Sequence, residues 1–141
     1  MKYKKISFDW DNTIAMSYMV DSDDSELPVY TFQGYNDKII DLIKEYYNQN
    51  IELFIVTSRK RSLEQYYPED SVHYQLQMLN LSHIFPPARV HFTEGDLKAK
   101  TLRDLGVELH YDDSMEEVLE CKKAGIDVIP AMDFHPDVNV V

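Results

Sequence analysis

The chain has 141 residues, of which 44% are hydrophobic and 28% are charged, a composition typical of folded domains rather than disordered segments. Because 25 acidic residues outnumber 14 basic ones, the formal net charge is −11, which argues against a general affinity for nucleic-acid phosphates. No apolar run has the length of a membrane span, and the single cysteine, Cys121, has no intramolecular partner for a disulfide. We therefore expect one domain spanning 1–141, located in the cytoplasm and not in a membrane.

Short apolar runs of strand character alternate along the chain with segments of helical periodicity. The candidate strands cover 5–8, 51–56, 88–92, 107–111 and 126–129. A helix is expected after the N-cap Asn36, others over 71–81 and over 97–105 before Gly106, and a last one at the capping box 114–117. This alternation predicts an α/β fold, a Rossmann-like three-layer sandwich with a mainly parallel five-stranded sheet.

Two segments interrupt the alternation. Residues 14–34 are too long for a simple turn and contain an acidic run at 21–26, so we expect a loop or small hairpin that forms a flap over the end of the first strand. Residues 60–70 are basic and then aromatic, and we expect a loop and turn there, with Tyr66 and Tyr67 as candidate substrate contacts. Neither segment is long enough for a second domain.

Polar side chains follow the candidate strands at their carboxyl ends, where open α/β sheets bind ligands. They are Asp9, Asp11 and Asn12 after the first strand, Thr57, Ser58 and Arg59 after the second, Lys98 at a helix start, and Asp112 and Asp113 after the fourth strand. Carboxylates crowded in this way repel one another, and a hard cation such as Mg²⁺ relieves the repulsion and screens an incoming phosphate. A carboxylate beside a bound phosphoryl group can act as a nucleophile. The pattern therefore favours Mg²⁺-dependent phosphate chemistry.

These residues also carry a resemblance to a known family. The segment 8–13, a hydrophobic residue followed by D-x-D-x-T, resembles the first motif of the haloacid dehalogenase (HAD) superfamily. Thr57 at the end of an apolar run is similar to the second motif, and Lys98 to the third. The pair Asp112 and Asp113 after a strand resembles the fourth. All four occur in the family's order, so the chain is identified as a HAD-like hydrolase.

The resemblance implies a role for each residue. Asp9 would be the nucleophile and Asp11 the general acid and base, whose main-chain carbonyl reaches the metal. The implied metal ligands for Mg²⁺ are Asp9, Asp11, Asp112 and Asp113, the last either as a ligand or beside one. The expected phosphate or substrate contacts are Asn12, Thr57, Ser58, Arg59 and Lys98. Lys100 competes with Lys98 as the phosphate-binding lysine, and a surface ion pair competes with the contact role of Arg59.

The implied function is a Mg²⁺-dependent phosphatase that hydrolyses phosphomonoesters through an aspartyl-phosphate intermediate. The intervals after the first and second motifs leave no room for a cap domain, so the chain looks like a capless member, similar to magnesium-dependent phosphatases and to the 3′-phosphatase domains of polynucleotide kinases. An open site of this kind suits a large substrate, or a partner or neighbouring subunit of a homo-oligomer that acts as a lid. The alternatives are a nucleotide or nucleic-acid 3′-phosphatase and a non-catalytic binding protein of HAD fold. A phosphorylated receiver domain has its acidic pair early in the chain, whereas here the pair comes last.

Overall fold

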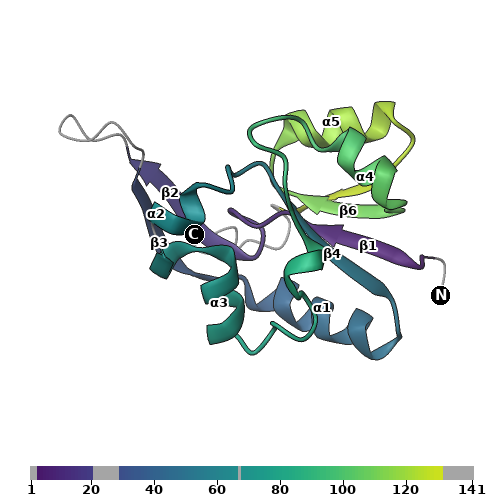
Figure 1. The fold of residues 1–141 in the computed structure, drawn as a ribbon. Helices are drawn as coiled ribbons and strands as arrows, with labels where there is room; N and C mark the ends of the chain where they lie inside the picture. The colour runs from purple at the N-terminus through teal and green to yellow at the C-terminus, as the bar shows by residue number, and fades with distance from the viewer. Residues whose placement is uncertain (1–2, 21–28, 67, 132–141) are drawn as a thin grey trace, which may run out of the picture.

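The centre of the molecule is a five-stranded parallel sheet, seen in a computed structural model that describes residues 3–20, 29–66 and 68–131 (Figure 1). Its strands are β1 (Lys5–Phe8), β4 (Glu52–Thr57), β5 (Val90–Phe92), β6 (Leu109–Asp112) and β7 (Asp127–Pro130). They lie in the order β5-β4-β1-β6-β7, with every neighbouring pair parallel. The predicted α/β class and parallel sheet are therefore confirmed.

Helices pack on both faces of the sheet, as its apolar strands require, because a parallel sheet buries both of its faces. Helices α1 (Asp37–Asn48) and α3 (Val72–Met78) lie on one side, and α4 (Ala99–Leu105) and α5 (Met115–Lys123) lie on the other (Figure 1). The larger apolar cluster includes Phe8 and Ile55, and a smaller one includes Val56 and Leu102. Among the described residues, no helix combines the length and apolar character needed to cross a bilayer.

The helix boundaries follow the capping residues of the sequence. The Asn36 side chain accepts a hydrogen bond from the backbone N–H of Ile39 at the start of α1, and Ser71 accepts one from Tyr74 at the start of α3. Helix α4 ends at Gly106, whose φ of 76° is the left-handed conformation that favours glycine. The positions predicted for these helices are confirmed to within a few residues.

The capping box predicted at the start of α5 is only half formed. The Ser114 hydroxyl accepts from the backbone N–H of Glu117, but the Glu117 carboxylate accepts from the backbone N–H of Lys98 instead of returning to Ser114. The Ser114 N–H donates to Asp112. The prediction was wrong at Glu117 because a tertiary contact with the segment before α4 replaces the local one.

A hairpin leaves the carboxyl edge of the sheet immediately after β1 (Figure 1). Its strands β2 (Ala15–Val20) and β3 (Val29–Tyr35) pair antiparallel, which is one of the two forms expected for 14–34. The acidic run 21–26 lies outside the described residues, as does Tyr67. The loop and turn expected over 60–70 instead contain a helical turn, α2 (Leu63–Tyr66), and a 3₁₀ turn, η1 (Pro68–Asp70). A second 3₁₀ turn, η2 (Pro87–Arg89), precedes β5.

Candidate functional site

The carboxyl ends of β1, β4 and β6 meet at one edge of the sheet and form a hollow of about 250 Å³. Predicted site residues from distant parts of the chain line it, among them Asp9, Asn12, Ser58, Lys98 and Asp113. Strand order explains the convergence, because β1 lies between β4 and β6 and all three run in the same direction.

Lys98 lies at the centre of the cluster and connects three carboxylates. Its Nζ donates to Oδ1 of Asp9 at 2.8 Å and to Oδ2 of Asp112 at 2.6 Å, and Glu117 Oε2 lies 3.9 Å away. The side chain is only 2% exposed. Burial by itself lowers the pKa of this ammonium, but the carboxylates of Asp9 and Asp112 outweigh burial and raise the pKa above its ordinary value. The competing candidate, Lys100, is exposed on α4.

Asp9 follows β1 directly and is buried beside two other acidic residues. Burial raises the pKa of its carboxyl well above the usual range; Lys98 opposes this, and the nearby carboxylates of Asp112 and Asp113 add to it. One oxygen from each of the three acids lies within 4.8 Å of the others. The site therefore holds more negative charge than Lys98 compensates.

Asp112 is held by a buried chain of hydrogen bonds through β6. Its Oδ2 lies 2.8 Å from Nε2 of His110, whose Nδ1 lies 2.6 Å from the hydroxyl of Ser7. Burial lowers the pKa of His110, so the ring is neutral at pH 7 and has one N–H. Because the Asp112 carboxylate can only accept, Nε2 carries that hydrogen and Nδ1 accepts from Ser7.

The same contacts set the charge of Asp112. Burial raises the pKa of this carboxyl, but the hydrogen bond from His110 and the charge of Lys98 outweigh burial and lower the pKa to about 2. His110 was not among the predicted site residues. The signal that could have found it is strand alternation, since His110 and Asp112 are two positions apart on β6 and share one face.

Arg59 and Asp11 form a pair at the side of the hollow. The Arg59 guanidinium donates from Nε to Asp11 Oδ2 and from Nη2 to Asp11 Oδ1, both at 2.8 Å. Asp11 lines the hollow, whereas the Arg59 side chain is 5% exposed. Thr57 is also buried, and its hydroxyl accepts from the backbone N–H of Arg59 at 3.2 Å. Among Thr57, Ser58 and Arg59, only Ser58 is exposed, and it lines the hollow.

The donor set suits a magnesium ion. Asp9, Asp112 and Asp113 offer carboxylate oxygens, the ligands that Mg²⁺ prefers. Burial, and after it the carboxylates of Asp112 and Asp113, raise the pKa of Asp9, and the positive charge of a divalent cation would oppose these effects. The resemblance placed Asp11 at the metal through its main-chain carbonyl. The Asp11 carboxylate is bound by Arg59 and does not belong to the group formed by Asp9, Asp112 and Asp113. These residues therefore fit the implied cation.

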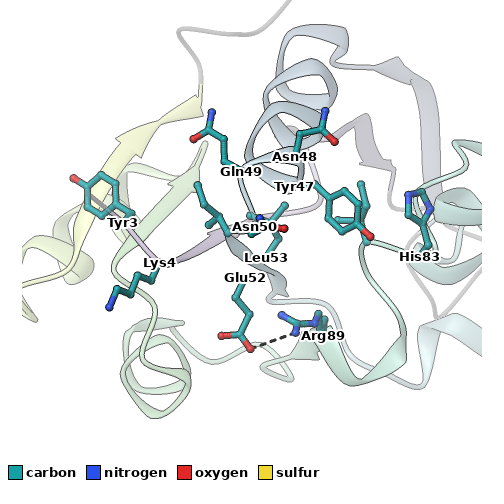
Figure 2. A pocket seen from close by; sticks show the side chains of 12 residues that line it. Tyr3, Lys4, Tyr47, Asn48, Gln49, Asn50, Glu52, Leu53, His83 and Arg89 are labelled. Carbon is teal, nitrogen blue, oxygen red and sulfur yellow. Dashed lines mark ion pairs between the residues drawn. The ribbon is translucent and has the colours of Figure 1, made fainter. Parts of the chain in front are cut away.

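A larger hollow, of about 920 Å³, lies at the opposite edge of the sheet, by the amino ends of β1 and β4 (Figure 2). Its lining combines the amides of Asn48, Gln49 and Asn50 with rings such as Tyr47. The ion pair drawn in it joins Arg89 and Glu52 at 3.3 Å. The lining has no counterpart of the acid and lysine cluster, so the candidate chemistry belongs to the smaller hollow.

No protein-family model matches the sequence, and no curated protein matches it significantly. The functional argument therefore rests on the residues of the site.

Proposed function

We propose that the protein is a Mg²⁺-dependent phosphatase that hydrolyses phosphomonoesters through an aspartyl-phosphate on Asp9, and that it is a capless member of the HAD superfamily. The observation that carries the proposal is the position of the Asp9 carboxylate, which lines the hollow 2.8 Å from the Lys98 ammonium and beside Asp112 and Asp113. The carboxylates of Asp9, Asp112 and Asp113 and the Lys98 ammonium thus share one small space, which supports their roles as nucleophile, metal ligands and phosphate contact. The order of the four motifs along the chain is the second support.

In the first half of the reaction, a carboxylate oxygen of Asp9 attacks phosphorus and the bond from phosphorus to the ester oxygen breaks. Asp11, protonated on one oxygen while the other still accepts from Arg59, gives this proton to the departing oxygen, which leaves as an alcohol. In the second half, water attacks phosphorus, Asp11 takes a proton from that water, and Asp9 is released together with inorganic phosphate. Lys98 stabilises charge on the phosphoryl oxygens. A bound Mg²⁺ would supply further charge neutralisation through Asp9, Asp112 and Asp113.

The direct test is hydrolysis of p-nitrophenyl phosphate with Mg²⁺ and with EDTA, using wild-type protein and Asp9→Asn. We expect turnover that requires the metal and that falls to background in Asp9→Asn, because the amide is not a nucleophile. Asp104→Asn is the matched control, since Asp104 is exposed on α4 and should leave turnover unchanged. Full activity in Asp9→Asn, or equal rates in EDTA, would contradict the mechanism. Binding of Mg²⁺ and phosphate esters without turnover would favour the non-catalytic alternative.

The net charge of the protein decides which substrates to compare next. The formal charge of −11 disfavours long polynucleotides, so nucleotides and other small phosphate esters should be compared with 3′-phosphorylated oligonucleotides. A preference for the oligonucleotide would support the 3′-phosphatase alternative.

A further inference from the structure

We propose that Arg59 is a positioning residue that fixes the Asp11 carboxylate, rather than a contact for the substrate phosphate; this inference rests on the proposed function. The sequence left both readings of Arg59 open, as a phosphate contact or as a member of an ion pair. The contacts of its guanidinium favour the second reading and give it a catalytic purpose.

The guanidinium is engaged on all three of its nitrogen atoms. Nε and Nη2 grip the two oxygens of Asp11 at 2.8 Å each, and Nη1 donates to the backbone carbonyl of Asp70 at 2.8 Å. This two-point grip fixes both the place and the plane of the carboxylate. A phosphate that recruited Arg59 would have to break these bonds, and the side chain is 5% exposed.

The far side of Arg59 is anchored to the segment that precedes α3. Glu64, on α2, lies 3.9 Å from Nη1, and its carboxylate also accepts from the backbone N–H groups of Val72 and His73 at the start of α3. Through these contacts, α2 and the first turn of α3 hold the guanidinium in place. The helical turn α2, which replaces part of the expected loop, therefore helps to hold Arg59 beside Asp11.

Asp11 needs such a support because it does not belong to a strand of the main sheet. It follows Asp9 in the connection to the hairpin, next to Asn12, whose φ of 61° marks a tight turn. Its side chain is 26% exposed, so water has access to this carboxylate. Proton transfer requires a group within hydrogen-bond reach of the reacting oxygen, and small displacements of such a group are costly.

Arg59→Lys is the informative variant, because lysine keeps the charge but lacks the planar two-point fork. Hydrolysis of p-nitrophenyl phosphate, which has a good leaving group, should be compared with that of an alkyl phosphate, which depends on proton donation. We expect kcat for the alkyl phosphate to fall about 10- to 100-fold, a smaller loss with p-nitrophenyl phosphate, and KM within about twofold of wild type for both. Arg61→Lys is the matched control, since the Arg61 guanidinium lies over the Phe92 ring at 5.0 Å.

A double-mutant cycle makes the test specific. If Arg59 acts through Asp11, the leaving-group pattern of Arg59→Lys should match that of Asp11→Asn, and adding Arg59→Lys to Asp11→Asn should cause no further loss. A raised KM with equal losses on both substrates would make Arg59 a phosphate contact and overturn the inference. An undiminished loss in the Asp11→Asn background, or wild-type kinetics in Arg59→Lys, would overturn it as well.

Two further outcomes have a defined meaning. If circular dichroism shows that Arg59→Lys does not fold, Glu64→Gln is the variant to use, because it weakens the contacts that hold Arg59. We expect it to reduce kcat for the alkyl phosphate more than kcat for p-nitrophenyl phosphate, by smaller factors than Arg59→Lys. Equal kcat losses on the two substrates, or no loss, would overturn the inference. No turnover by wild-type protein on either substrate would overturn the proposed function itself, whereas wild-type turnover with an unaffected variant overturns only the role of Arg59.

Discussion

Replacing Lys98 with methionine tests whether one cation holds the acidic cluster together. Methionine is similar in length, but the variant leaves Asp9 and Asp112 as neighbouring buried carboxyl groups without the ammonium that lies within 2.8 Å of each. Removing one partner of a buried ion pair costs about 3–5 kcal/mol, because the remaining charge stays buried and unpaired. We expect the free energy of unfolding at pH 7 in EDTA to fall by about this amount.

The pH dependence identifies the cause of this loss. Burial already raises the pKa of Asp9 above its unfolded value near 3.8, and without Lys98 this pKa should rise further, while the pKa of Asp112 should rise from its low value. Ionisation of Asp9 then opposes folding above that unfolded value, and the penalty disappears as pH falls toward it. Wild-type protein, in contrast, loses the contribution of its ionised Asp112 as pH falls below the same value. The difference between the two proteins should therefore shrink between pH 7 and pH 4.

Urea unfolding followed by circular dichroism at pH 7 and at pH 4.5 measures both effects. Lys100→Met is the control, because Lys100 is exposed two residues away and its loss should change the unfolding free energy by less than about 0.5 kcal/mol. The reasoning would be refuted by a loss below about 1 kcal/mol at pH 7. A loss of equal size at both pH values would also refute it, since that result points to packing rather than charge.

Three further predictions concern the same cluster. Mg²⁺ at about 100 times its dissociation constant should raise the free energy of unfolding, measured with urea, by about 2.7 kcal/mol. Asp113→Asn should remove most of this gain, and an unchanged gain would exclude Asp113 as a ligand. Asp112 has a pKa of about 2 in the folded protein and 3.8 when unfolded, which provides about 2 kcal/mol of stability above pH 4 that is lost as pH falls toward 2. In a series of thermal melts at different pH, Asp112→Asn should therefore weaken the fall in stability between pH 4 and pH 2. Ser7→Ala removes the donor to Nδ1 of His110 and should cost about 1–3 kcal/mol in urea unfolding; an unchanged midpoint would show that the hydrogen bond does not contribute.

The framework of the fold could be predicted because its signals are local. An apolar run such as 51–56 has the length and composition of a buried strand, and Asn36, Ser71 and Gly106 mark helix ends by their own conformational preferences. Such signals need no knowledge of the rest of the chain. They failed at α2 and η1, short turns that tertiary contacts hold and that show no periodicity of their own.

The sequence also predicts that the site residues meet at one edge of the sheet, but it does not predict which side chains pair with one another. Parallel strands bring their carboxyl ends to one edge, so Asp9, Lys98 and Asp112 were expected to meet there. The partner of Asp11 is 48 residues away in Arg59, and no local pattern connects the two. Glu117 shows the same limit, because its spacing from Ser114 predicts a capping contact while the fold gives it to the backbone of Lys98 instead.

The balance of charge at the hollow is the reason why we expect the proposed phosphatase reaction to require a cation. Carboxyl side chains predominate in its lining, and Lys98 is the ammonium among them. Arg59 adds no free positive charge, because its guanidinium is already bound to Asp11. A doubly charged phosphate would therefore meet a net negative site and be repelled. Binding of Mg²⁺ to Asp9 and its neighbours reverses that sign locally, so substrate affinity itself, and not only the rate of the chemical step, should depend on the metal.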